Sequence, residues 1–227
     1  MQTPSKNWFE RVEASAIVMK TSSDPAGDIP LRPLLKLCED ALSGYSILYA
    51  KGWVSKILQE DFQGNIAKMQ RVCVCLEEGR PGAVTQATVG GALTRAAALP
   101  NGVHSDEGVW GILWCARTLR FVAELLRALG SDETLSISAA GRATYAKVLS
   151  TYHAPVFAFL VGTIVGWAPT RNWVLAHTLE GMVNSDATTA CARTAAALAP
   201  VPDAIIFALA AANADFPDRI SALPFGL

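Results

Sequence analysis

Apolar residues recur at helical spacing along most of the sequence, whereas the strict alternation of apolar and polar residues typical of β-strands is scarce. The stretches between the periodic segments contain Gly, Pro, Asn and Asp, which end helices or start new ones. The pattern therefore predicts one all-α domain of about eight or nine helices. The predicted helices cover residues 8–20, 31–50, 58–78, 83–98, 105–129, 136–168, 171–183, 186–198 and 202–213.

The longest apolar stretch without a charge covers residues 154–169. It is shorter than the roughly 20 residues that a helix needs to cross a bilayer. We therefore expect a strongly apolar helix in a soluble protein. Pro155 should bend this helix near the start of the stretch, because proline lacks the N–H that a helix interior requires.

Composition narrows the possible functions. Of the 227 residues, 51% are hydrophobic and 17% are charged, and the net charge of −1 provides no basic surface for nucleic acid. The five cysteines have irregular spacing, which indicates reduced thiols in a cytosolic protein, and the three histidines also lack the spacing of metal ligands. The N-terminus has no apolar segment of a secretory signal. We expect a cytoplasmic protein without a metal or cofactor.

A polar stripe lies beside the apolar face of the predicted helix 58–78. Asp61, Asn65 and Lys68 are spaced i, i+4 and i+7, roughly a quarter-turn from the apolar residues. Gly64 lies between them at a cost of about 1 kcal/mol relative to alanine, and it removes a side chain where another group could approach. The stripe is either a solvated flank or a site for a polyhydroxylated ligand, whose hydroxyls would match a carboxylate, an amide and an ammonium group.

Two tryptophans share one face of a later helix. Trp110, Trp114, Arg117, Phe121 and Leu125 follow one another at steps of 4, 3, 4 and 4 residues. These side chains either fill the core or, at the aromatic end, provide a flat surface on which a sugar ring can stack.

His153 lies at the border of the uncharged stretch. Leu149 precedes it by one helical turn, and Val161 and Val165 continue on the same side of the predicted helix. A single histidine at such a border is usually structural, although with Asp61 it could form a base and its orienting partner. No nucleophile elbow, metal-ligand cluster or phosphate-binding loop accompanies it in the sequence, so catalysis is disfavoured.

Three segments together resemble the glycolipid transfer protein family. Residues 61–68 read DFQGNIAK, similar to the family's Asp-x-x-Gly-Asn-x-x-Lys helix. Residues 113–121 read LWCARTLRF, similar to Leu-Trp-Leu-x-Arg-x-Leu-Arg-Phe, with a cysteine in place of the second leucine. The pair Tyr152–His153 is followed sixteen residues after the histidine by Pro169, as in the family. The resemblance runs from about residue 31 to residue 169 and continues more weakly beyond.

The resemblance implies a fold and a binding site. Residues 1–227 would form a single domain, a two-layer helical sandwich of about eight helices that encloses an apolar lipid pocket. Asp61 and His153 would grip the ceramide amide. The residues implied in headgroup binding are Asp61, Asn65, Lys68, Trp114 and His153. The residues implied in lining the lipid-chain pocket are Phe121, Leu125, Leu149, Val161 and Val165, with Trp110 near the entrance.

The residue at position 114 distinguishes two branches of the family. A related branch that carries ceramide-1-phosphate has arginine there, so Trp114 favours a sugar headgroup. The resemblance implies a non-catalytic, monomeric carrier that moves glycosylceramides between membranes and touches the membrane surface only transiently. A glycolipid sensor or scaffold, and ceramide-1-phosphate transfer, remain as alternatives.

One departure from the family concerns membrane docking. The family often has tryptophan two residues after the histidine, where this sequence has Pro155. Docking through Trp53 or Trp167 is therefore expected, because tryptophan favours the membrane interface. Arg171 follows Trp167 closely enough to meet lipid phosphates.

Overall fold

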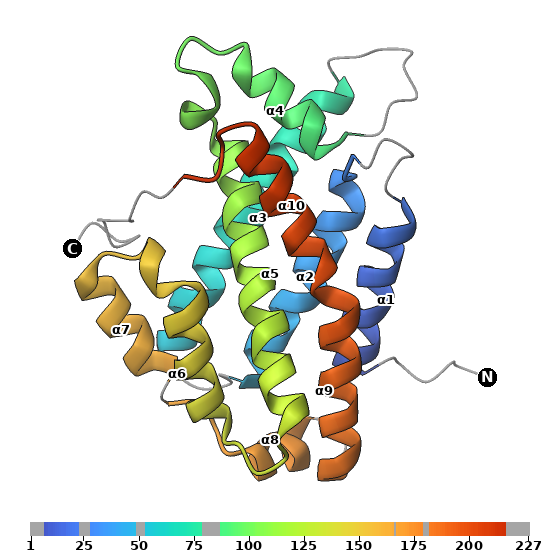
Figure 1. The fold of residues 1–227 in the computed structure, drawn as a ribbon, viewed down its shortest axis with the longest axis vertical. Helices are drawn as coiled ribbons and strands as arrows, with labels where there is room; N and C mark the ends of the chain where they lie inside the picture. The colour runs from blue at the N-terminus through green and yellow to red at the C-terminus, as the bar shows by residue number, and fades with distance from the viewer. Residues whose placement is uncertain are drawn as a thin grey trace.

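The computed structural model describes residues 7–22, 28–48, 53–78, 87–165, 167–178 and 182–216. These residues form helices and turns without a β-strand, so the predicted all-α class is confirmed (Figure 1). The α-helices are α1 (Trp8–Ser22), α2 (Leu31–Leu48), α3 (Trp53–Glu78), α4 (Val89–Ala97), α5 (Glu107–Ser131), α6 (Ile137–Val148), α7 (Pro155–Val165), α8 (Arg171–Thr178), α9 (Asn184–Leu198) and α10 (Pro200–Ala211). Two short 3₁₀ turns cover Gly102–Ser105 and Ser150–Tyr152.

Several helices begin where the sequence supplies a polar cap. The side chains of Thr88, Asp106 and Ser136 accept hydrogen bonds from the backbone N–H groups of Gly91, Val109 and Ala139. Each cap satisfies one of the N–H groups that lack a partner within the helix. The caps therefore fix the starts of α4, α5 and α6.

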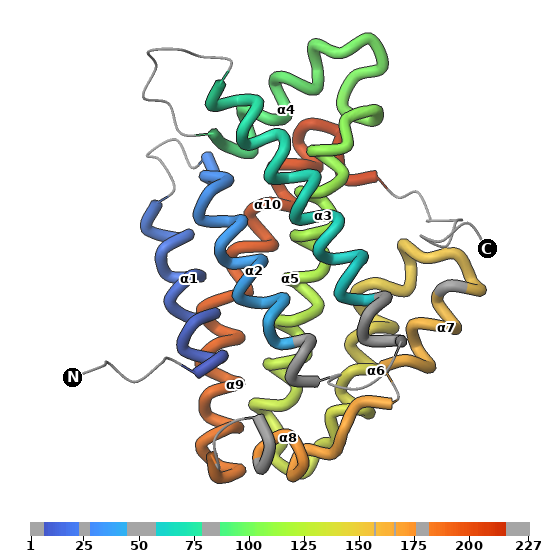
Figure 2. The backbone as a smooth tube through the Cα atoms, turned by 180° about the vertical axis from the view of Figure 1, so that it is seen from behind, coloured from blue at the N-terminus to red at the C-terminus, as the bar shows by residue number. Residues whose placement is uncertain are grey.

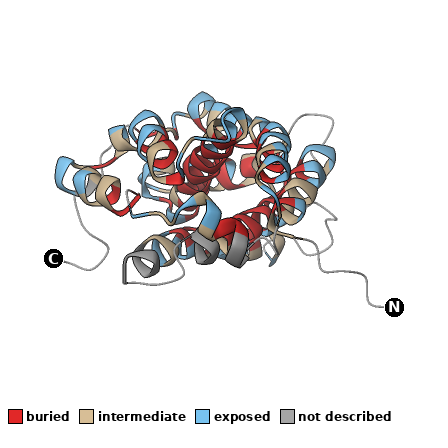
Figure 3. Cartoon of the chain, turned by 90° about the horizontal axis from the view of Figure 1, so that it is seen from below, coloured by how far each residue is buried: buried red, intermediate tan, exposed pale blue. Residues whose placement is uncertain are grey.

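The helices form two layers. Helices α1, α2 and α3 pack side by side in one layer, and α6, α5 and α9 pack side by side in the other (Figures 1 and 2). Contacts between α3 and α5 and between α1 and α9 join the layers, while α10 extends α9 across α5. Figure 3 shows the buried residues gathered on the inner faces of the helices. The predicted two-layer sandwich is thus the observed architecture.

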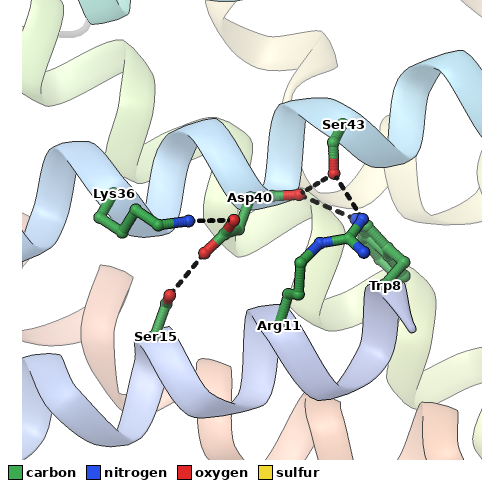
Figure 4. Close-up of polar contacts among 6 residues, drawn as sticks. All are labelled: Trp8, Arg11, Ser15, Lys36, Asp40 and Ser43. Carbon is green, nitrogen blue, oxygen red and sulfur yellow. Dashed lines mark hydrogen bonds and ion pairs between the residues drawn. The ribbon is translucent and has the colours of Figure 1, made fainter. Parts of the chain in front are cut away.

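A buried carboxylate fixes α1 against α2 (Figure 4). Asp40 on α2 is 6% exposed, accepts a hydrogen bond from Ser15 Oγ on α1 at 2.6 Å, and pairs with Lys36 one turn away. The Asp40 carbonyl oxygen also accepts from Trp8 Nε1 at 2.9 Å. Because a buried charge needs partners, these contacts define how the two helices align.

Glycines allow α3 and α5 to approach closely. A Cβ atom added to Gly111 on α5 would lie 2.7 Å from the Asn65 carbonyl oxygen and 3.1 Å from the Met69 backbone nitrogen on α3. One turn earlier, a Cβ atom on Gly108 would lie 2.7 Å from Val72 Cβ. Any larger residue would push the two backbones apart. This close crossing brings the polar stripe of α3 to the tryptophan face of α5.

The prediction of one continuous helix over 136–168 is wrong. Helix α6 ends at Val148, a 3₁₀ turn follows, and α7 begins at Pro155. Proline has no N–H to donate and disfavours helical geometry in the residue before it, but it fits well at the first position of a helix. The break leaves His153 in an extended conformation with φ −108° and ψ 141°. It therefore belongs to a bend between two helices and not to a helix.

Among the described helices, the stretch Asn184–Ala211 is long and apolar enough to cross a membrane by length and composition alone. This stretch comprises α9 and α10, which pack against α1 and α5 in the sandwich. Core helices of soluble proteins satisfy the same criterion, so the criterion alone decides little.

Candidate functional site

The polar stripe of α3 and the tryptophan face of α5 meet in one hollow. The hollow has a volume of about 180 Å³. Its walls are formed by Asp61, Asn65, Lys68, Glu107, Trp110 and Trp114. The structure thus places four of the five predicted headgroup residues in the walls of a single concave surface.

Asp61 is the carboxylate of the α3 wall. Its side chain reaches the surface, yet the surrounding protein restricts its hydration, and this desolvation raises its pKa above the ordinary value. The positive charge of Lys68 acts in the opposite direction. A poorly hydrated carboxylate gains from hydrogen bonds donated by a ligand, because those bonds replace the missing water.

Glu107 was not predicted as part of the site. It begins α5 and precedes Trp110 and Trp114 by three and seven residues, so all three lie on one face of the helix. That spacing is readable in the sequence and could have identified it. Trp110 was predicted to stand near the entrance of the chain pocket, but the structure places it in the wall of the polar hollow.

Trp114 is less open than a stacking platform requires. Its side chain is 5% exposed, and its ring stacks on His153 with centroids 5.4 Å apart and planes 6° from parallel. Tyr152 meets the ring edge-on at 6.4 Å. The bend before Pro155 brings His153 and Tyr152 to this position. His153, the fifth predicted headgroup residue, therefore lies behind Trp114.

His153 is buried and uncharged. Its Nδ1 shares a hydrogen bond of 2.7 Å with the Tyr145 hydroxyl, and its side chain is 7% exposed. Burial, and secondly the charge of Arg117, lowers the pKa of His153 from 6.5 to about 4. Burial also raises the pKa of Tyr145, so its hydroxyl stays protonated. At neutral pH, the pair is a neutral link between Trp114 and α6.

The free energy of unfolding should fall as the pH falls from 6.5 to 4. In this window the unfolded chain binds a proton at His153 that the folded protein excludes, since the folded pKa is about 4. The resulting loss of stability amounts to roughly 3 kcal/mol at most and is complete below pH 4. Urea unfolding at several pH values should show a weaker acid effect for His153→Gln than for the wild type. A comparable weakening in His104→Gln, which removes an exposed histidine, would contradict this assignment.

Arg117 anchors the rear of the site. It is 1% exposed and donates to Asp215 Oδ1 at 2.8 Å and to the Phe216 carbonyl oxygen at 2.5 Å. Its guanidinium also lies over the rings of Tyr152, at 3.6 Å, and Trp114, at 5.1 Å. Arg117 therefore ties the segment after α10 to the aromatic cluster of the site.

A separate apolar cavity lies in the interior of the sandwich, with most of its walls formed by α5 and by helices that pack around it. Its volume is about 120 Å³, and its walls include Phe121, Leu125, Leu149, Val161 and Val165. Leu58 of α3 and Tyr145 of α6 also border it. Five of the six residues predicted for the chain pocket thus border one cavity, and the sixth, Trp110, borders the polar hollow.

Comparison with known proteins identifies the family. The family model described as glycolipid transfer protein (GLTP) matches residues 29–180, which is more than half of the chain. The chain belongs to the glycolipid transfer protein family. No curated protein sequence matches it significantly.

Solved structures show the glycolipid transfer protein fold at low sequence identity. The GLTP-fold domain of FAPP2, described as selecting simple glycosphingolipids, has a TM-score of 0.74 at 16% identity and covers 95% of this chain and 100% of its own. Human ceramide-1-phosphate transfer protein in complex with that lipid has a TM-score of 0.73 at 16% identity, with coverages of 91% and 98%. The fungal glycolipid transfer protein HET-C2 has a TM-score of 0.70 at 15% identity, with coverages of 93% and 97%.

Three residues were considered for contact with the membrane: Trp167, Trp53 and Arg171. Trp167 follows α7 and is 63% exposed. Trp53 begins α3, and its side chain lies outside the described part of the structure. Arg171 was expected to meet lipid phosphates, but it donates to the carbonyl oxygens of Leu129 and Asp132 and to Thr188 Oγ1. In this member of the glycolipid transfer protein family, Arg171 holds α8 to the ends of α5 and α9.

Proposed function

We propose that this protein moves sphingolipids with sugar headgroups between membranes, as a soluble cytoplasmic monomer and without a covalent step. The hollow between α3 and α5 receives the headgroup, and the apolar cavity receives the hydrocarbon chains. Ceramide-1-phosphate transfer and glycolipid sensing are the competing functions within the same fold.

The order of the two surfaces along α3 and α5 is the observation that carries this proposal. Leu58 borders the apolar cavity and lies two turns before Asn65 on the same face of α3. Phe121 borders the cavity and lies two turns after Trp114 on the same face of α5. One pair of facing helices therefore changes from polar to apolar along its length, as a lipid does from headgroup to chain.

The charges of the hollow favour a sugar over a phosphate. Two carboxylates, Asp61 and Glu107, face one ammonium group, that of Lys68, within its walls. A phosphate would meet both negative charges, whereas sugar hydroxyls can donate to the carboxylates and accept from the lysine. Arg117, a buried cation that contacts the Trp114 ring, does not border the hollow and already pairs with Asp215.

The apolar cavity must widen as lipid enters. At about 120 Å³ it is comparable to cavities that hold one benzene molecule, so two hydrocarbon chains need more room. Each CH₂ group that is removed from water contributes about 0.8 kcal/mol. A chain in a bilayer is already out of water, so its transfer into the apolar cavity brings little net gain. Burial in the cavity therefore keeps the chains out of water during transfer, whereas the headgroup contacts determine which lipid is selected.

A vesicle-to-vesicle transfer assay tests the function directly. The lipids are glycosylceramides and ceramide-1-phosphate with identical chains. We expect transfer of the glycosylceramides with a clear preference over the phosphate. Faster transfer of ceramide-1-phosphate would identify the other branch, binding without transfer would indicate a sensor, and conversion of the lipid would indicate an enzyme.

Membrane docking is proposed to use the exposed apolar surface of α7 and the residue that follows it. Val156 and Phe159 are each 78% exposed, and Trp167 is 63% exposed. Together they provide apolar side chains that can enter the interface without burying a charge. A surface of this kind gives weak and reversible binding, as a carrier requires.

Replacing Phe159 and Trp167 with alanine should reduce partitioning onto vesicles at least tenfold while lipid binding in solution persists. Large apolar side chains contribute about 1.5–3 kcal/mol each on full burial, and interfacial burial is partial. Phe207→Ala is the matched control, because Phe207 is 77% exposed on α10. A parallel Trp53→Ala variant covers the other expected docking residue. Unchanged partitioning in both test variants would place docking elsewhere.

A further inference from the structure

A second polar hollow adjoins the first. It has a volume of about 210 Å³, close to the 180 Å³ of the first. Its walls are formed by Lys68, Arg71, Val72, Cys75, Arg95, Asp106, Glu107 and Gly108. Lys68 and Glu107 border both hollows, so the two hollows lie on either side of these two side chains.

Charged pairs line the second hollow with both donors and acceptors. Arg71 Nη2 lies 3.1 Å from Glu107 Oε2, and both side chains are well exposed. Arg95 pairs with Asp106, whose other oxygen accepts from the Val109 N–H at the start of α5. Within the described structure, Arg95 Nε is buried without a hydrogen-bond partner. The hollow therefore offers an exposed ion pair that can open toward a ligand.

We propose that the second hollow binds the second sugar of a neutral headgroup with two or more sugars. This inference rests on the proposed function and names the part of the headgroup that the adjoining surface would select. Sugar hydroxyls both donate and accept, and so they can insert between Arg71 and Glu107 and satisfy both. The exposed ion pair contributes little to stability and is readily exchanged for such bonds. The similar volumes of the two hollows fit one sugar ring in each.

A neutral sugar fits this hollow better than an acidic substituent. Three cations, Lys68, Arg71 and Arg95, line it together with two carboxylates, Asp106 and Glu107. Asp106 is committed to Arg95 and to the cap of α5, so its charge stays in the wall. The remaining cation, Lys68, acts on Asp61 of the first hollow, so the two hollows together hold three cations and three carboxylates and leave no positive charge unmatched for a sulfate or carboxylate group on the ligand.

Two variants alter the second hollow without changing a wall of the first. Arg71→Ala removes a donor, and Cys75→Trp fills the space from an exposed position on α3. Gln70→Ala is the matched control, because Gln70 is exposed on the same helix and borders neither hollow. Vesicle binding is measured for ceramides with one neutral hexose, with two neutral hexoses and with one sulfated hexose, all with the same chains.

We expect each variant to weaken binding of the two-hexose ceramide at least fivefold and to change binding of the one-hexose ceramide less than twofold. Equal effects on both lipids, or no effect on either, would overturn the proposal. A selective loss of the sulfated lipid in Arg71→Ala would also overturn it and would indicate an anion site. If the wild type bound none of these lipids, the proposed function itself would fail, and the assay would distinguish that result from failure of the second hollow alone.

Discussion

Replacing Asp61 with valine should abolish glycolipid transfer while the protein stays folded. The carboxylate lies in the wall of the polar hollow, where it can accept hydrogen bonds from sugar hydroxyls or from the ceramide amide. Hydrogen bonds to a charged group contribute about 1.5–3 kcal/mol each, so loss of two should reduce transfer about a hundredfold or more. The fold should tolerate the change, because desolvation already raises the pKa of this carboxyl and removal of the charge relieves that cost.

Gln63→Val is the matched control for this variant. Gln63 is exposed on α3 and borders neither hollow, and its replacement introduces the same β-branched residue into the same helix. An Asp61→Asn variant keeps an acceptor without the charge and should retain part of the activity. Transfer is measured together with the thermal unfolding midpoint. Wild-type transfer by folded Asp61→Val protein would refute the role of this residue.

Replacing Asp215 with asparagine should lower the free energy of unfolding by about 2 kcal/mol. The change leaves Arg117 buried without a negative partner, and breaking a fully buried ion pair from one side costs about 3–5 kcal/mol. The expected value is lower because the Asp215 side chain is 27% exposed and the Phe216 carbonyl oxygen still accepts from Arg117. Urea unfolding measures the difference.

A double-mutant cycle separates the ion pair from other effects. In an Arg117→Met background, Asp215→Asn should change stability by less than about 0.5 kcal/mol, since no buried cation remains. The exposed pair Arg120–Asp203, which joins α5 to α10 at 3.4 Å, should show a coupling of at most about 1 kcal/mol. An equal cost of Asp215→Asn in both backgrounds would show that the charge of Arg117 is not the cause.

Local patterns in the sequence predicted most of the helices and the residues that α3 contributes to the site. Helical periodicity predicted which faces of the helices point inward. The spacing of Asp61, Asn65 and Lys68 predicted that they share one stripe, and in the structure this stripe forms part of the wall of the hollow. The family resemblance then supplied the residues of the chain pocket. The same spacing argument extends to Glu107, which continues the tryptophan face of α5 toward its N-terminus.

Features that depend on tertiary contacts could not be predicted in this way. The proline predicted a bend near Pro155, but the stack of His153 on Trp114 that this bend permits joins side chains from two separate segments, which no local pattern indicates. Likewise, the hydrogen bonds of Arg171 to the ends of neighbouring helices have no local signature. A side chain that meets partners distant in sequence looks the same in the sequence as one that meets solvent.

The pairing of Arg117 with Asp215 has a consequence for synthesis of the protein. The two residues are 98 positions apart, so at about 5–20 residues per second the ribosome needs roughly 5–20 s to make the counter-ion after the cation. During that interval α5 cannot bury Arg117 against its native partner. The aromatic cluster behind the hollow can therefore be completed only after Asp215 has been synthesised, and lipid that meets the chain before then meets an unfinished site.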